Sequence, residues 1–313
     1  MSQRMRTLVI LPPVLTLSHH EVLTAAGLIG EIEVVNIGEP ELDVMAQYGV
    51  KRVFVPEAEI PELVTPAQVA EAVAQITAAR QPDAIIMMAS FIGKETAARL
   101  SILLDAGAIV DVNSLRVDGD QIVVGKTVLQ GTWDTEAIAV RGPAILAVKP
   151  TSFEPKPNPA GYPHIERVPV ELSPVARAVE RLERIVPPPS ERPNLEEARI
   201  VVVGGRGVEG DFALVEQLAD ALGGAVGATR VATDERWIGH AAQIGQTGVT
   251  IAPRLYIGLG VSGAVHHTSG MTGAEVVVAV NTDADAPIFE IADFGIVGDL
   301  HTVVPAILAA LRQ

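Results

Sequence analysis

The sequence predicts an α/β protein of two domains, each a mainly parallel β-sheet flanked by helices, with the second sheet doubly wound. Two observations support this prediction. Short apolar runs of strand length alternate with helix-like stretches in the first half of the chain, and the same alternation restarts after a proline-rich segment at residues 187–193. Parallel strands need a long crossover, usually a helix, so this alternation is typical of parallel sheets.

The first half contains four apolar runs that we expect to be strands and one stretch that we expect to be a helix. The strands are residues 7–11, 33–36, 52–55 and 84–88, and the helix is residues 66–80. The last strand is followed by a turn at residues 90–95 and an amphipathic helix at residues 97–104. This order indicates a strand, a turn and a helix N-terminus.

The pattern changes between residues 110 and 148. Shorter strand-like runs occur at residues 121–124, 128–129 and 144–148, and Asp118, Gly119 and Asp120 mark a turn before them. We therefore expect a few antiparallel strands to be added to the sheet here.

The proline-rich segment at residues 187–193 divides the chain. Proline lacks a backbone N–H and fits neither a helix interior nor a central strand. We therefore expect a first domain at residues 1–190 and a second domain at residues 191–313.

The second half repeats the alternation. We expect strands at residues 199–203, 225–228, 255–259, 275–280 and 288–291, and helices at residues 211–222 and 303–311. Open parallel sheets bind ligands beyond the carboxyl ends of their strands. Polar residues that directly follow these strands are therefore candidates for ligand contacts.

The composition excludes several classes of function. The formal net charge of -15 over 313 residues disfavours binding to nucleic acid or anionic membranes. Because the chain has no cysteine, disulfides, thiolate zinc sites and cysteine-ligated clusters are excluded, and redox chemistry would need an organic cofactor. No segment approaches the ~20 apolar residues of a membrane helix. We expect a soluble cytoplasmic protein without membrane insertion.

A glycine turn follows the first strand of the second half. Residues 205–210 match the pattern G-x-G-x-x-G between an expected strand and an expected helix, a place that favours a phosphate. Such glycines also allow close packing alone, and the two interpretations weigh about equally. Arg206 in this turn slightly favours an anion, because its guanidinium offers forked donors.

The next strand ends at Thr229 and Arg230, which are candidates for ligand contacts or for a helix cap and a solvated arginine. An acid for the ribose of NAD would be expected near this point, and Asp234 is the nearby candidate.

Two further loops contain side chains suited to a heterocycle. Residues 243–248 supply two amides and a hydroxyl on a glycine-containing loop, and residues 258–264 form a second backbone nest for phosphate. His266 and His267 follow, and neighbours in a strand point to opposite faces, so at most one would serve a site. Zinc is improbable because no third ligand accompanies the pair.

Asn281 follows the strand at 275–280, and Asp293 and Asp299 flank the apolar residues 294–297. Each alone is more often a turn residue than a ligand contact. Their placement after successive strands makes them a joint candidate set.

These stretches together resemble the alpha subunit of electron transfer flavoprotein. The motifs are Val-Gly-Gly-Arg-Gly at 203–207, Gly-Ala-Thr-Arg at 227–230, Gln-Ile-Gly-Gln-Thr-Gly at 243–248, Val-Ser-Gly-Ala-Val-His-His at 261–267 and Ala-Asp-Phe-Gly-Ile-Val-Gly-Asp-Leu at 292–300. The first half resembles the family more loosely, through its α/β alternation, the turn at 90–94 and residues 97–100.

The resemblance implies an FAD held mostly by the second domain, while the first domain contacts a beta subunit. The residues that would line the FAD are Arg206, Thr229, Arg230, Ile244, Gly245, Gln246, Thr247, Ser262, Gly263, Ala264, Val265, His266, His267, Asn281, Asp299 and Leu300. By the family pattern Arg230 would lie against the flavin ring, Thr247 would bond near its reactive nitrogen, and His267 near its pyrimidine oxygen.

The implied function is that of an electron carrier, not of an enzyme with its own reaction. Its FAD would accept electrons from acyl-CoA and other flavin dehydrogenases, as in fatty acid beta-oxidation, and pass them to a membrane quinone oxidoreductase. The chain would act in a heterodimer with the beta subunit. The alternatives are the alpha subunit of an electron-bifurcating flavoprotein, a stand-alone NAD-dependent enzyme with His267 as general base, or a nucleotide-binding module.

Overall fold

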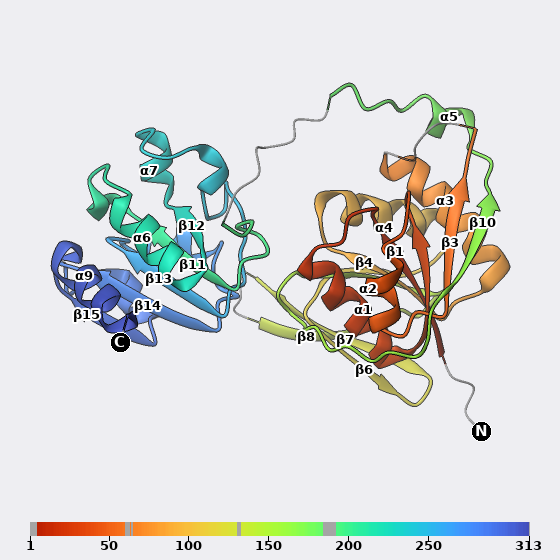
Figure 1. Cartoon of the computed structure of the whole chain (residues 1–313), viewed down its shortest axis with the longest axis horizontal. Coiled ribbons are helices and arrows are strands. Elements are labelled where there is room, and N and C mark those ends of the chain that lie inside the picture. Colours follow the sequence, from red (N-terminus) through yellow and green to blue (C-terminus); the bar gives the residue numbers. More distant parts are fainter. Residues whose placement is uncertain (1–4, 60–62, 64, 130–132, 184–191, 313) are drawn as a thin grey trace. The chain divides into compact units, whose positions relative to one another are not determined.

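The structure is a computed structural model that describes residues 5–59, 63, 65–129, 133–183 and 192–312. The chain divides into two compact units: unit 1 is Met1–Val128 with Asp134–Val186, and unit 2 is Leu129–Trp133 with Pro187–Gln313. The boundary expected between residues 190 and 191 lies outside the described residues. Each unit contains a parallel sheet flanked by helices (Figure 1), so the predicted fold class is confirmed.

Unit 1 is built on a seven-stranded sheet with the order β10-β3-β2-β1-β4-β9-β5, whose neighbouring strands are parallel. Its strands are β1 (Met5–Leu11), β2 (Gly30–Asn36), β3 (Arg52–Glu57), β4 (Ala84–Met88), β5 (Ala108–Val112), β9 (Ala144–Val148) and β10 (His164–Pro169). Its helices are α1 (Leu17–Ile29), α2 (Leu42–Gln47), α3 (Pro66–Arg80), α4 (Phe91–Leu103) and α5 (Pro174–Arg177). The expected first four strands are confirmed.

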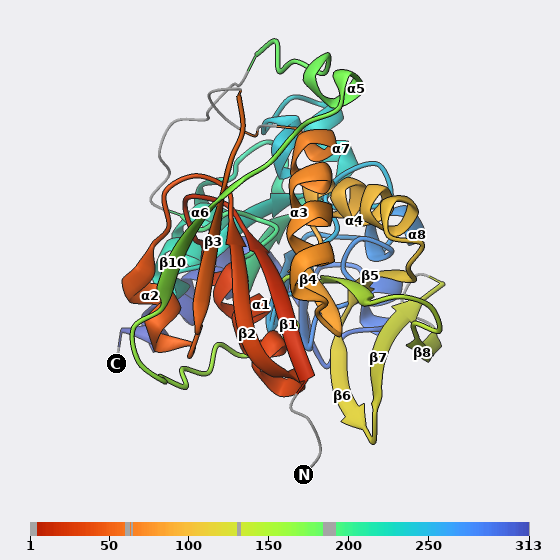
Figure 2. The ribbon, with the colours of Figure 1, turned by 90° about the vertical axis from the view of Figure 1, so that its right-hand side faces the viewer.

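Two buried layers cover the faces of this sheet, because alternate side chains of a strand point to opposite faces. Val9 and Leu11 of β1 pack in a cluster with residues of α1. Leu8 and Ile10 pack in a second cluster with residues of α3 and α4. Figure 2 shows α3 and α4 side by side along the sheet.

Helix α3 has the bounds that its sequence predicts, and its first turn explains why. The Thr65 hydroxyl accepts a hydrogen bond from the Gln68 N–H at 3.4 Å, and the Gln68 side chain accepts one from the Thr65 N–H at 3.1 Å. This reciprocal pair satisfies two N–H groups that have no partner within the helix. Pro66 occupies the first helical position, where a missing N–H costs nothing.

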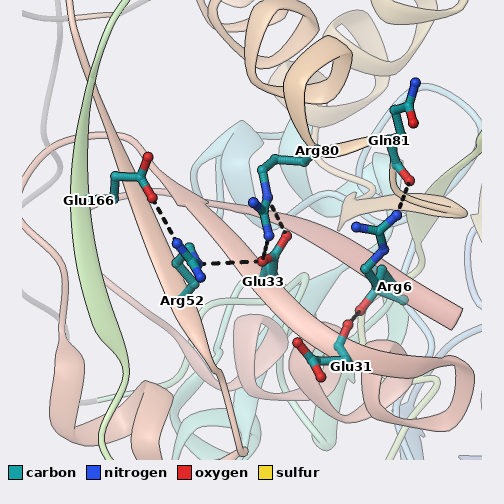
Figure 3. A network of polar contacts seen from close by, with 8 residues as sticks. Arg6, Glu31, Glu33, Arg52, Arg80, Gln81 and Glu166 are labelled. Carbon is teal, nitrogen blue, oxygen red and sulfur yellow. Dashed lines mark hydrogen bonds and ion pairs between the residues drawn. The ribbon is translucent and has the colours of Figure 1, made fainter. Parts of the chain in front are cut away.

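A buried carboxylate joins α3 to the sheet (Figure 3). Glu33 of β2 is 4% exposed and accepts hydrogen bonds from two guanidinium nitrogens of Arg80, the last residue of α3. Arg52 of β3 lies 3.7 Å from Glu33 and 3.0 Å from Glu166 of β10. The Arg80 guanidinium also lies 5.3 Å from the centre of the Phe54 ring. A buried carboxylate needs such partners, so this network stabilises the packing of α3 against three strands.

Three expectations for unit 1 were wrong. The turn expected at residues 90–95 lies in α4, because the Ser90 hydroxyl accepts a hydrogen bond from the Gly93 N–H at 3.0 Å and caps a helix that starts at Phe91. Residues 128–129 form no separate strand, because β7 (Gln121–Val128) continues to Val128. Of the runs expected to add antiparallel strands to the sheet, residues 121–124 lie in β7, which forms a separate three-stranded sheet with β6 (Ser114–Asp118) and β8 (Trp133–Ile138). Residues 144–148 form β9, which is a parallel strand of the main sheet.

Unit 2 is built on a five-stranded parallel sheet with the order β12-β11-β13-β14-β15. Its strands are β11 (Ile200–Gly204), β12 (Ala225–Ala228), β13 (Leu255–Leu259), β14 (Val276–Asn281) and β15 (Phe294–Val297). Helices α6 (Ala213–Leu222) and α9 (Leu300–Leu311) pack on one face, with Leu218 and Val304 in the same buried cluster. The other face is covered by Ile244, Met271 and Ile288 from irregular segments.

Two expectations for unit 2 were also wrong. Residues 288–291 are not a strand, because Pro287 begins a 3-10 turn (Pro287–Glu290) that places Ile288 in the core. The last strand is β15. Helix α9 begins at Leu300 and not at residue 303, because Asp299 caps it through the His301 N–H at 2.9 Å and Pro305 is tolerated within it.

Candidate functional site

The carboxyl ends of the five strands of unit 2 meet at one edge of the sheet, because all five strands are parallel. The loops after β11, β12, β13, β14 and β15 start at Gly205, Thr229, Gly260, Thr282 and Gly298. The segment 243–249 joins this edge through a bridge between Gln243 and Ala228 at the end of β12. The structure therefore brings all the loops that contain the expected FAD residues to the same edge.

Two glycine loops touch at the point where the strand order reverses, between β11 and β13. The Gly207 N–H donates to the Gly260 carbonyl at 3.0 Å. A Cβ atom on Gly207 would lie 2.7 Å from the Gly260 Cα, and one on Gly205 would lie 2.3 Å from the Gly260 carbonyl oxygen. The first two glycines of the G-x-G-x-x-G pattern, Gly205 and Gly207, are therefore required for close packing of the two loops.

The first N–H group of the helix after this turn is already bonded to an acidic side chain. The Asp211 carboxylate accepts a hydrogen bond from the Ala213 N–H, the first residue of α6, at 2.9 Å. An acidic side chain thus already occupies the positive end of the helix dipole. Arg206 is exposed in the turn itself, where its guanidinium can reach a bound anion.

The loop after β12 contains an unpaired buried hydroxyl. Thr229 begins helix α7 (Arg230–Asp234), but its side chain forms no cap, and its Oγ1 atom is buried without a hydrogen-bond partner among the described residues. Buried polar atoms normally have partners, so this oxygen is available to a ligand. Arg230 beside it is exposed and pairs with Asp234 at 3.1 Å.

The loop at residues 243–249 is fastened to the loop at residues 262–267. The Gln246 N–H donates to the His266 carbonyl at 2.7 Å. A Cβ atom on Gly245, whose φ is +139°, would lie 2.5 Å from the same oxygen. The conformations of the two loops are therefore coupled. The exposed Thr247 lies on this constrained backbone.

Thr247 is held through a buried glutamine. Gln243 is 2% exposed, and its Nε2 donates to the Thr247 hydroxyl at 2.9 Å. The hydroxyl of Thr233 donates to the Gln243 Oε1 at 2.6 Å. Sequence reasoning noted the Gln243 amide but not its burial, and it missed Thr233, because no local pattern pairs residues ten positions apart.

The two histidines lie in a short helix, α8 (Val265–Thr268), and not in a strand as expected. His266 is exposed, whereas His267 is 6% exposed and uses both ring nitrogens within the protein. Its Nδ1 donates to the Ile244 carbonyl at 3.1 Å, so its Nε2 accepts from the Tyr256 hydroxyl at 2.8 Å. Burial lowers the pKa of His267 to about 4 and outweighs the Ile244 hydrogen bond that raises it.

His267 is therefore neutral near pH 7, and neither nitrogen is free in this structure. A hydrogen bond from His267 to the flavin would require exchange of one of these partners. The same arrangement opposes the role of general base that the NAD-dependent alternative assigned to it. Tyr256, which sequence reasoning missed, is fully buried, and its burial raises the pKa of its hydroxyl.

The polar residues near the ends of β14 and β15 mainly support the backbone around these strands. The Asn281 Nδ2 donates to the Val261 carbonyl at 2.9 Å, and its Oδ1 accepts from the Asp283 N–H at 3.0 Å. Asp299 caps α9, and Asp293 accepts from the Val277 N–H at 2.8 Å. Asn281 thus supports the loop after β13 and connects two parts of the edge.

The remaining expected residues contribute mostly backbone atoms to the candidate site. The side chains of Ile244 and Leu300 are buried, at 1% and 6% exposure. A Cβ atom on Gly263 would lie 2.3 Å from the Ile288 nitrogen, so this glycine permits close contact between two loops. Ser262, Ala264 and Val265 are exposed beside it.

Comparisons with known proteins match both halves of the chain. The profile of the electron transfer flavoprotein domain matches residues 15–173, and that of the electron transfer flavoprotein FAD-binding domain matches residues 194–272. The chain is 39% identical to the electron transfer flavoprotein subunit alpha of Mycobacterium leprae, over 93% of this chain and 92% of that protein.

The chain belongs to the electron transfer flavoprotein alpha subunit family. It is also 36% identical to the alpha subunit of Syntrophomonas wolfei, over 86% of this chain and 84% of that protein. The corresponding identity to the Bacillus subtilis alpha subunit is 33%, over 91% of this chain and 88% of that protein. The electron transfer flavoprotein resemblance and the FAD cofactor expected from the sequence are thus confirmed.

The residues at the sheet edge fit the FAD of an electron transfer flavoprotein. The orphaned Thr229 hydroxyl can bond to a ligand oxygen or nitrogen. Two exposed guanidiniums, Arg206 and Arg230, follow the adjacent strands β11 and β12, where cations can stabilise negative charge on a bound FAD. Among the described residues, no group of three or more potential metal ligands gathers. Within the same part of the chain, no helix has the length and hydropathy of a membrane span.

Proposed function

We propose that this alpha subunit pairs with a beta subunit and carries electrons through FAD. The FAD would accept electrons from acyl-CoA and other flavin dehydrogenases in the cytoplasm, and pass them to a membrane quinone oxidoreductase. The family membership supports the carrier role. The observation that most supports the FAD position is the joined pair of loops at residues 243–249 and 262–267, which present the exposed Thr247 at the carboxyl edge of the sheet, where the loops that contain Arg206 and Arg230 also begin.

The roles of the residues follow from their chemistry. FAD supplies reversible one- and two-electron chemistry when it is bound. Arg206 and Thr229 would bind the phosphate and ribityl part, since a guanidinium and a free hydroxyl suit oxygen-rich groups. Arg230 would lie against the flavin ring, where a cation stabilises negative charge. Thr247 would form a hydrogen bond to the ring edge, and the neutral His267 would support the Ile244 backbone beneath it.

The test is the visible absorption spectrum of the protein purified with its bound partner. About one FAD per heterodimer supports the carrier role. Two flavins per heterodimer would instead indicate an electron-bifurcating protein. A colourless preparation that retains its partner would refute the proposal and favour a nucleotide-binding module.

A further inference from the structure

The buried side-chain amide of Gln243 lies between two threonine hydroxyl groups. Its oxygen end lies 2.6 Å from the Thr233 hydroxyl, and its nitrogen end lies 2.9 Å from the Thr247 hydroxyl. Gln243 and Thr233 are 2% and 8% exposed, so water cannot replace these partners, whereas Thr247 is exposed. A hydroxyl group can both donate and accept, so each end of the amide has a partner of either kind.

The observed orientation leaves the Thr247 proton free. Thr233 donates to the Gln243 oxygen, and the Gln243 nitrogen donates to the Thr247 oxygen. Because the Thr247 oxygen then accepts from inside, its own proton points outward and can be donated to a ligand. The 2.6 Å distance at the Thr233 end suits an O–H to O hydrogen bond.

A half turn of the amide reverses every bond without leaving a buried group unpaired. The Gln243 nitrogen then donates to Thr233, and Thr233 donates to the Arg230 carbonyl, which already lies 2.9 Å from its hydroxyl oxygen. The Gln243 oxygen accepts the Thr247 proton, so a lone pair of Thr247 faces the ligand. The Arg230 carbonyl is the second acceptor that makes both orientations possible.

We propose that Gln243 is a positioning residue that lets the Thr247 hydroxyl change between donor and acceptor toward the bound FAD. The reactive nitrogen of an oxidised flavin accepts a hydrogen bond, and after full reduction it bears a proton and donates one. A fixed donor would suit only one of these states, whereas the reversible amide suits both. This inference rests on the proposed function, which places the flavin ring against Thr247.

The first experiment measures the amide itself, in the FAD-loaded heterodimer with 13C-labelled glutamine side chains. The infrared difference spectrum between reduced and oxidised protein should contain one glutamine carbonyl band that shifts, because the oxygen changes its partner from Thr233 to Thr247. This band should be absent from Gln243→Met, whose side chain has a similar length and no amide. If that variant does not fold, Thr233→Val identifies the band by moving it. A Gln243 band with one frequency in both states overturns the inference.

The second experiment separates positioning from general structural support by a double-mutant cycle. Gln243→Met should raise the Kd of oxidised and of reduced FAD alike by about fivefold, the worth of one hydrogen bond, and so leave the midpoint potential nearly unchanged. In a Thr247→Ala background the same substitution should leave both Kd values unchanged. A fivefold effect that persists there would show a structural role and overturn the inference.

A wrong assignment of the FAD site would give a different result from a wrong inference about Gln243. If Thr247→Ala binds both redox states of FAD like the unmodified protein, Thr247 does not contact the flavin, and the site assignment and the inference both fall. If Thr247→Ala weakens binding but the Gln243 band does not move on reduction, the site stands and only the inference falls.

Discussion

His267 should make unit 2 sensitive to acid. Its pKa is 6.5 in the unfolded chain and about 4 in the folded protein, where burial disfavours the imidazolium. Between these values the unfolded state binds more protons, so stability falls as the pH falls. The free energy of unfolding of unit 2 should therefore decrease by about 2 kcal/mol from about pH 7 to about pH 5, and by about 3 kcal/mol in full once the pH is below 4.

The substitution His267→Gln removes the titrating group and keeps a side chain that can donate and accept hydrogen bonds. The variant should lose this pH dependence in unit 2. The assay is hydrogen exchange of the buried amides of β11 and β13 in the flavin-free chain, so that FAD binding does not add to stability.

A matched control lies in unit 1. His19 is also 6% exposed, and burial, with the nearby charge of His20, lowers its pKa to about 4. His19→Asn should remove the acid sensitivity of β1 and β4 and leave that of unit 2 unchanged. If unit 2 loses the same free energy between about pH 7 and about pH 5 in His267→Gln as in the unmodified chain, the argument from burial of His267 is refuted.

Three other predictions follow from single contacts. Arg80→Met removes the guanidinium that bonds to the buried Glu33 and leaves it with the weaker ion pair to Arg52 at 3.7 Å. The stability of unit 1 should fall by about 3 kcal/mol in urea unfolding, and a loss below about 1 kcal/mol would contradict this. Arg230→Ala should lower the FAD midpoint potential while FAD is retained, and an unchanged redox titration would remove Arg230 from the site. Gly260→Ala should destabilise unit 2 by about 2 kcal/mol more than Gly223→Ala in calorimetry. Both glycines have positive φ (+62° and +65°), but only at Gly260 would the added Cβ lie against a neighbour, 2.6 Å from the Gly207 Cα. Equal losses would show that the two loops can separate freely.

The elements that the sequence predicted well are those defined by consecutive residues. The bounds of α3 follow from Thr65, Pro66 and Gln68, which are neighbours in the chain. The strands β12 and β13 also have the expected bounds, since apolar runs between glycines and polar residues define them locally. At Pro287 and Pro305, in contrast, the sequence analysis misplaced the element, because the effect of these two prolines depends on the packing around them.

At the candidate site, too, features defined by neighbouring residues were predicted, and features set by packing were not. The loops with the expected FAD residues were recognised from motifs after strands, and the parallel sheet of unit 2 places these loops at one edge. The sequence did not reveal that Asp211 already caps α6, that His267 is bonded at both nitrogens, or that Gln243 is buried between two threonines. Each of these contacts depends on the burial and direction of a side chain.

The sequence by itself determined the α/β class, the family and the positions of the loops beyond the strands, because periodicity, capping and motif spacing are properties of neighbouring residues. Only the tertiary structure decided which polar atoms are already paired and which remain available to a ligand. Tyr256 reaches His267 and Gly207 reaches Gly260 across distances in the chain that no local pattern encodes. Which polar atoms bond to each other depends on the folded packing, because the packing brings distant segments of the chain together and excludes water from between them.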